Sequence, residues 1–155
     1  MNGKKINYER ILNALLRNLL PTINSNVPPQ FFAGKMETFL TCRAVANHLA
    51  ENKIIDESSG KFFEELALKA IYKTLSTGMT FADARLLISE ISTLLTLNYS
   101  EVEQIRGALM KIIPQMTETL RLNIQDSSQF SLWRDIVELE NILNLLKAFD
   151  NYKHK

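Results

Sequence analysis

The spacing of apolar side chains constrains this chain more than any other feature of its sequence. Apolar residues recur every three or four positions through almost the whole length, which is the periodicity of one face of an α-helix. Strands would instead alternate apolar and polar residues. The first stretch shows the helical pattern clearly, because its single stripe contains Tyr8, Ile11, Leu12, Leu15, Leu16 and Leu19. The pattern therefore predicts an all-α protein.

Turn residues divide the predicted protein into about six helices. The chain of 155 residues has only 5 Gly and 4 Pro, which favours long helices over many short strands. Ser58 or Ser59 is the expected N-cap of the third helix, and Ser100 with Glu103 matches a reciprocal capping box. The predicted helices span residues 7–20, 29–53, 60–77, 81–97, 101–125 and 129–150.

The fifth predicted helix contains Pro114, a residue that normally ends a helix. The apolar positions nevertheless keep one phase through the proline, and Pro114 itself falls on the opposite side. We expect one helix that is kinked at Pro114. Two helices with a break at 113/114 are the alternative.

Length and composition predict a single helical domain, residues 1–155, folded as a compact bundle. Hydrophobic residues make up 46% and charged residues 23%, which is ordinary for a globular protein. The sequence contains no internal repeat of the kind that would indicate a solenoid. No apolar run is long enough to span a membrane, and the N-terminal stretch is too polar for a signal peptide, so we expect a cytoplasmic protein without a membrane partner.

The sequence contains no recognisable catalytic, nucleotide-binding or metal-binding motif. Cys42 and His48 fall on one predicted helix about 120° apart, with the cysteine inward and the histidine outward, so they cannot act as a pair. We therefore expect no enzymatic activity, no cofactor and no metal. Three carboxylate pairs are interpreted as solvated faces or helix-start charges: Glu64/Glu65, Glu101/Glu103 and Glu138/Glu140.

The apolar stripe of the last predicted helix changes sides midway, which indicates a change of neighbour. The later stripe packs either within the same chain or against another protein or a second copy of this chain. The second alternative makes a non-enzymatic interaction protein (an adaptor, a regulator or a small subunit of a larger assembly) the leading hypothesis. Its candidate interface residues are Ile142, Leu145, Leu146 and Phe149.

The N-terminal third of the chain carries a mild excess of basic residues, although the formal net charge of the whole chain is only +1. Residues 1–53 contain seven Lys or Arg against three Asp or Glu. Nucleic-acid binding is therefore the alternative function. Its candidate contacts, among which Lys35 and Arg43 are expected to direct their charged ends outward, are Lys4, Lys5, Arg10, Arg17, Lys35, Arg43 and Lys53.

Overall fold

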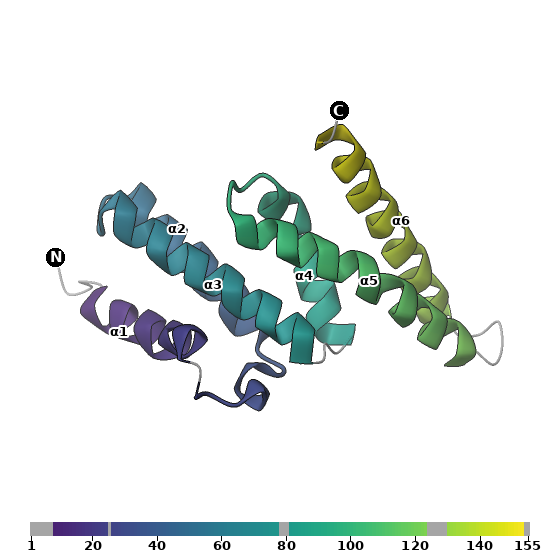
Figure 1. Ribbon diagram of the computed structural model, residues 1–155, viewed down its shortest axis with the longest axis horizontal. Coiled ribbons are helices and arrows are strands. Elements are labelled where there is room, and N and C mark those ends of the chain that lie inside the picture. Colours follow the sequence, from purple (N-terminus) through teal and green to yellow (C-terminus); the bar gives the residue numbers. More distant parts are fainter. Residues whose placement is uncertain (1–7, 25, 78–80, 124–129, 154–155) are drawn as a thin grey trace, which may run out of the picture. The chain divides into compact units, whose positions relative to one another are not determined.

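The computed structural model describes residues 8–24, 26–77, 81–123 and 130–153 (Figure 1). Within these ranges every regular element is helical and there is no strand, which confirms the predicted all-α class. None of the helices in them is both long and apolar enough to cross a membrane. Contacts fall into two compact units, Met1–Val102 and Glu103–Lys155. The single domain expected from the sequence stays a prediction.

Two central helices organise the first unit, and α2 and α3 pack against each other more extensively than any other pair of elements within it. The α3 helix also contacts α1, η1 and η2, and α2 also contacts α1 and α4. The elements of this unit are α1 (Tyr8–Leu19), the 3₁₀ turns η1 (Leu20–Ile23) and η2 (Pro29–Phe32), α2 (Met36–Glu51), α3 (Glu57–Thr77) and α4 (Phe81–Leu95).

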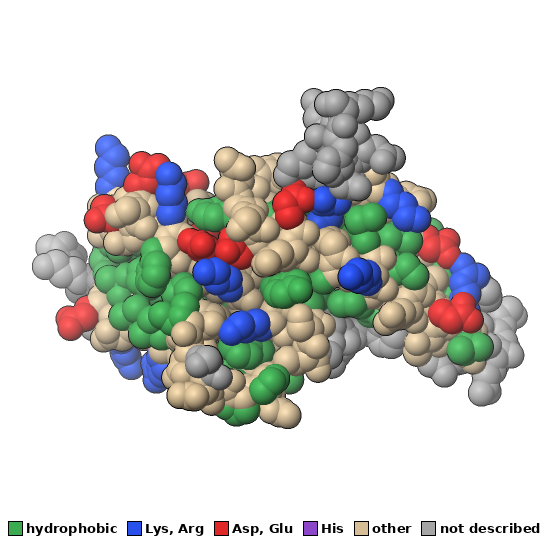
Figure 2. Space-filling view, in the orientation of Figure 1, with side chains coloured by type: hydrophobic (Ala, Val, Ile, Leu, Met, Phe, Trp, Pro, Cys, Tyr) green, Lys and Arg blue, Asp and Glu red, His purple; other side chains and the backbone are tan. Residues whose placement is uncertain are grey.

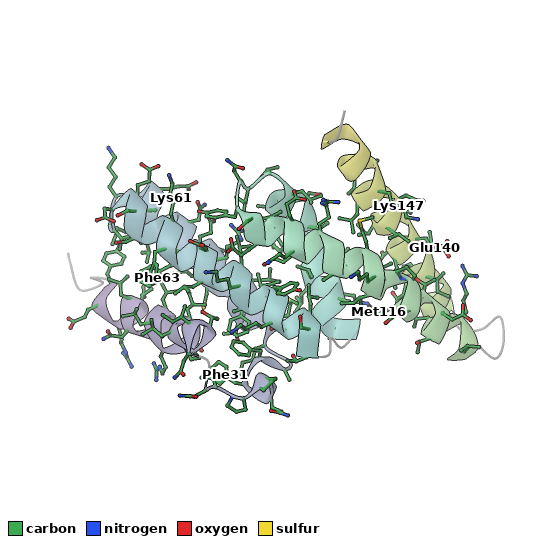
Figure 3. The ribbon with its side chains drawn as sticks, in the orientation of Figure 1. Phe31, Lys61, Phe63, Met116, Glu140 and Lys147 are labelled. Carbon is green, nitrogen blue, oxygen red and sulfur yellow. The ribbon has the colours of Figure 1, made fainter. Side chains whose placement is uncertain are left out.

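The core of the first unit lies where these helices meet. Phe63 is on the side of α3 that faces α1 (Figure 3), and Thr74 donates a hydrogen bond of 3.0 Å to the Phe32 carbonyl of η2. Some apolar surface stays in solvent, and Figure 2 shows hydrophobic side chains gathered over α1 and the first half of α3. The largest side chains of this core are fully buried: Leu19, Met36, Phe39, Leu49, Leu68, Ile71, Leu87, Ile91 and Leu94.

The second α-helix begins at Met36, so the predicted start near Pro29 is wrong by seven residues. Pro29 instead opens the short 3₁₀ turn η2, and the chain then passes through Gly34, whose φ of 68° lies in the left-handed region. Glycine adopts that conformation without steric cost, and a residue with a left-handed φ cannot continue a right-handed helix. Gly34 therefore separates η2 from α2. The Lys35 ammonium lies 3.4 Å from the centre of the Phe31 ring and covers this turn.

The connection between α2 and α3 also differs from the prediction at both ends. The α2 helix ends at Glu51 because Lys53 adopts a left-handed φ of 59° and the Ile54 amide donates to the Leu49 carbonyl at 2.9 Å, as in a Schellman cap. The α3 helix starts at Glu57, since Asp56 rather than Ser58 or Ser59 caps it. The Asp56 carboxylate accepts a 2.7 Å hydrogen bond from the Ser59 amide.

Most of the second unit consists of two helices, α5 (Ser100–Asn123), whose first residues belong to the first unit, and α6 (Phe130–Lys153). The α5 helix begins at Ser100, one residue before the predicted start, and is continuous through the exposed Pro114. The alternative of two helices broken at 113/114 is therefore wrong. Arg121 of α5 and Glu140 of α6 form an exposed ion pair.

The buried residues of α6, among those whose side chains are described, lie on one side of the helix. Ile136, Leu139 and Leu146 are buried, and at 100° per residue they share one side of the helix. Leu145 lies off that line and is 44% exposed. The apolar stripe of this helix was predicted to change sides midway, but the buried side chains among those described do not change sides.

Candidate functional site

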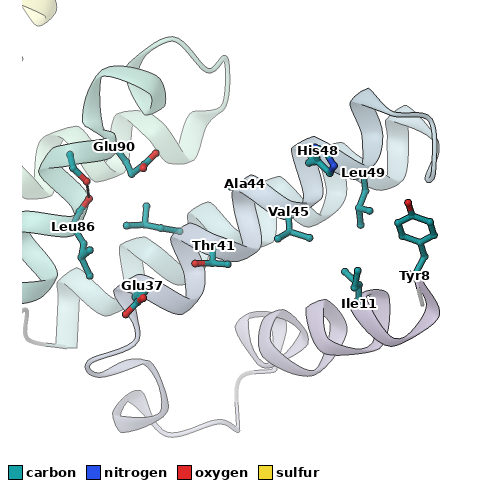
Figure 4. A pocket seen from close by; sticks show the side chains of 12 residues that line it. Tyr8, Ile11, Glu37, Thr41, Ala44, Val45, His48, Leu49, Leu86 and Glu90 are labelled. Atoms are coloured by element: carbon teal, nitrogen blue, oxygen red, sulfur yellow. Dashed lines mark hydrogen bonds between the residues drawn. The ribbon is translucent and has the colours of Figure 1, made fainter. Parts of the chain in front are cut away.

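An open groove in the first unit runs along α2 between α1 and α4 (Figure 4). Its volume is about 480 Å³. The α2 helix presents Thr41, Ala44, Val45 and His48 to it, spaced three or four residues apart as one helical stripe. Thr41, Ala44 and His48 are exposed and Val45 is half-buried, so the stripe consists of small or apolar side chains followed by the imidazole of His48.

The other two helices form the walls of this groove. Tyr8 and Ile11 of α1 lie near His48 at one end, and Leu86 and Glu90 of α4 lie at the other end (Figure 4). Leu40 and Leu49 of α2, which are buried, and Ser89 of α4 also line the groove. Leu86 is 37% and Tyr8 36% exposed, so apolar surface remains open to solvent on both walls.

The charge of the groove is acidic and concentrated at one end. Glu37, at the start of α2, and Glu90 of α4 lie there together with Leu86 (Figure 4). Among the described residues that line the groove, these two carboxylates are the charged groups and no Lys or Arg is present. The arrangement therefore favours an occupant that is apolar along its length and carries positive charge at one end.

A buried ion pair lies beside the groove and joins α2 to α3. Arg43 Nη1 donates to Glu64 Oε2 at 3.1 Å, and the side chains are 7% and 10% exposed. The same guanidinium approaches Glu90 of the groove wall, with Nη2 at 3.9 Å from Oε2. The Arg43 Nε atom is buried and has no hydrogen-bond partner among the described residues.

Tyr99, in the connection between α4 and α5, extends this buried cluster. Its hydroxyl donates to Glu64 Oε1 at 2.7 Å, so the two oxygens of Glu64 serve two different partners. Burial, followed by the hydrogen bond and the negative charge of Glu64, raises the pKa of Tyr99 well above its ordinary value. Tyr99 therefore stays a neutral donor under ordinary conditions.

Two predictions about charged residues are wrong at this cluster. Arg43 does not direct its charged end outward, because Glu64 holds it in the interior. Glu64 is not solvated, since it is only 8% exposed. Glu101 is the second residue of α5, as the interpretation of a helix-start charge expects, and Lys69 lies 4.0 Å from it. The sequence signal that could have revealed Arg43 is its position next to Cys42 on the apolar face of a helix, where a charge needs a buried partner.

A second, more polar hollow of about 600 Å³ lies at the α2–α3 connection. Its lining includes Lys53, Asp56, Lys61, Glu64 and Tyr99, with charges of both signs. The hydrogen bonds from Ser59 and Ser58 lower the pKa of the exposed Asp56. Asp56 caps α3 and Glu64 is held by Arg43 and Tyr99, so these carboxylates already have structural roles.

The candidate nucleic-acid contacts do not form one cluster. Arg10 and Arg17 are exposed and lie two turns apart on the same side of α1. Lys35 covers the Phe31 ring, Lys53 lies at the α2–α3 connection, and Arg43 is buried. Lys4 and Lys5 lie outside the described residues.

The candidate interface residues of α6 differ in burial. Leu146 is fully buried, Ile142 is half-buried and Leu145 is 44% exposed. The side chain of Phe149 lies outside those that the structure describes. Among the three of these residues whose side chains the structure describes, Leu145 is the one classed as exposed. A role for the set in an interface stays a prediction.

The predicted placement of Cys42 and His48 is confirmed. Cys42 is buried, which raises the pKa of its thiol, and His48 is exposed with its Nδ1 atom 3.3 Å from the Asn52 amide nitrogen. Within the described ranges, no group of three or more His, Cys, Asp or Glu residues could hold a metal ion.

Comparisons with protein-family models, curated proteins and solved structures each gave no significant match.

Proposed function

We propose that this chain is a non-enzymatic helical interaction protein that receives an apolar segment of another protein in the groove between α1, α2 and α4. The observation that supports the proposal is the groove itself, which keeps Tyr8 at one end and Leu86 at the other more than one third exposed. Helical proteins commonly bind partners by receiving apolar side chains in such grooves.

Nucleic-acid binding has less support from the arrangement of charges. The groove carries Glu37 and Glu90, which would repel phosphates, and Arg43 is held in the interior by Glu64. Arg10 and Arg17 of α1 remain as exposed basic residues on one side of that helix. Two such residues supply a small electrostatic contribution compared with the several phosphate contacts of typical nucleic-acid-binding proteins.

Site-specific photocrosslinking tests the proposal. A photoreactive amino acid replaces Ala44 in the groove, and a control replaces Ser76, which is exposed on α3 and does not line the groove. In cells of the organism that encodes the protein, we expect a protein adduct from position 44 and none from position 76. Adding Thr41→Arg should suppress the adduct, because the longer side chain occupies the groove, while circular dichroism stays unchanged.

Three results would contradict the proposal. The first is the absence of any protein adduct at position 44, and the second is equal adducts at both positions. The third is an adduct with nucleic acid, which would instead favour the alternative function.

A further inference from the structure

We infer that the occupant of the groove is an amphipathic helix of about three turns, from a separate protein, with a Lys or Arg at the end that lies beside Glu37 and Glu90. This inference rests on the proposed function and specifies the chemistry of the partner. Its basis is the length, the side-chain sizes and the charge distribution of the groove.

The length of the groove fits a short helix. The α2 residues that line it run from Glu37 to Leu49, which at 1.5 Å per residue is about 18 Å along the helix axis. A partner helix that lies along α2 would match this length with about twelve residues. Such a segment presents apolar side chains to the groove at three- and four-residue spacing.

The side chains along α2 allow a helix to approach closely. Thr41 and Ala44 are small and exposed, so the backbone of a partner can come near α2 between the two walls. Ile11 near one end of the groove and the exposed Leu86 near the other can contact the apolar side chains of that partner. These contacts suit an apolar stripe with polar residues on the remaining face.

The acidic end of the groove specifies the position of the positive charge. The Glu90 side chain is 42% exposed, and its distance of 3.9 Å from Arg43 Nη2 is too long for a hydrogen bond. Glu90 can therefore accept a hydrogen bond from a cation in the groove, while Glu64 holds Arg43 at 3.1 Å. Glu37 is exposed and also lies toward this end of the groove (Figure 4), so both carboxylates make the electrostatic potential there favourable for a Lys or Arg.

Mapping the crosslinked peptide tests this inference separately from the proposed function. The adduct formed at position 44 is digested, and the attached segment is identified by mass spectrometry. We expect a segment with apolar residues at helical spacing and a Lys or Arg near one end. An adduct with a segment that lacks this pattern, or with a second copy of this chain, overturns the inference but leaves binding in the groove intact. No adduct at all overturns both.

Charge reversal gives a quantitative test with the full chain. The mapped segment is made as a synthetic peptide, and its affinity is measured for the unchanged chain, for Glu37→Lys and for the control Glu118→Lys. Glu118 is exposed on α5 and lies outside the groove, so its variant changes the net charge equally. We expect Glu37→Lys to weaken binding about fivefold and to reduce its dependence on salt, as for the loss of one exposed ion pair.

The peptide should also gain helical circular dichroism when it binds. Equal affinities for Glu37→Lys and Glu118→Lys would overturn the charge assignment. Binding without a gain of helix would overturn the helical assignment.

Discussion

Replacement of Glu64 by leucine should destabilise the protein strongly, because it leaves the Arg43 guanidinium buried without its closest partner. The Arg43 side chain is 7% exposed and lies 3.1 Å from Glu64. Removal of one member of a buried ion pair costs about 3–5 kcal/mol. Glu90, 3.9 Å away and 42% exposed, retains part of the compensation, so we expect a loss near the lower end, about 3 kcal/mol.

Urea unfolding followed by circular dichroism measures this loss. With a slope near 2 kcal/mol per molar urea, a loss of about 3 kcal/mol lowers the midpoint by roughly 1.5 M. Lys61→Met on the same helix is the matched control, because the Lys61 side chain is 66% exposed and forms an ion pair with Glu57. That control should change the free energy of unfolding by less than about 1 kcal/mol.

A double variant separates the effect of the buried charge from that of the lost volume. Arg43→Met combined with Glu64→Leu removes both charges and leaves apolar side chains of similar size, so it should be clearly more stable than Glu64→Leu alone. The reasoning would be refuted by a loss below about 1 kcal/mol for Glu64→Leu. It would also be refuted by a double variant less stable than the single one.

Two further predictions concern α3. Gly60→Ala should destabilise the protein by about 1–3 kcal/mol in urea unfolding, because the new Cβ would lie 2.6 Å from Ala50 Cβ and force α2 and α3 apart. Gly107→Ala, where nothing lies within 4 Å of the new Cβ, should be neutral or stabilising by up to about 1 kcal/mol. A Gly60→Ala variant more stable than the Gly107→Ala variant would contradict the close packing of α2 against α3. Hydrogen bonds lower the pKa of Asp56 from its ordinary 3.8, so its stabilising contribution is present above that value and is lost as pH falls through the lowered pKa. The difference in free energy of unfolding between the unchanged chain and Asp56→Ala should therefore shrink below about pH 4. Urea unfolding at several pH values measures it, and a difference that stays constant to pH 2 would disprove the stabilising role of the Asp56 carboxylate.

The helix boundaries show how far local sequence reasoning extends. The continuity of α5 through Pro114 follows from an unbroken apolar phase, and α5 starts one residue before the predicted position. The capping box of Ser100 and Glu103 stays a prediction. The start of α2 was misplaced because Gly34 adopts a left-handed conformation inside an otherwise helical pattern. The cap of α3 was misplaced by two or three residues, since Asp56 and the two serines are all good capping residues and only geometry distinguishes them.

The local sequence pattern predicted the helices better than it predicted the candidate site. Thr41, Ala44 and His48 read in the sequence as the polar or small side of α2, and nothing local shows that α1 and α4 make that side the lining of a groove. Arg43 likewise reads as a surface residue until Glu64, 21 positions later in the chain, is placed beside it. Both features require knowledge of which helices are neighbours.

The sequence by itself determined that the described protein is helical, because helical periodicity is a property of neighbouring residues along the chain. It also determined that Cys42 lies inward and His48 outward, since both positions follow from the phase of one helix. Only the tertiary structure decided that Glu64 is buried with Arg43 and that Glu37 and Glu90 line the same groove. Those arrangements join residues distant in the chain, and their energies depend on burial and distance, which local periodicity does not encode.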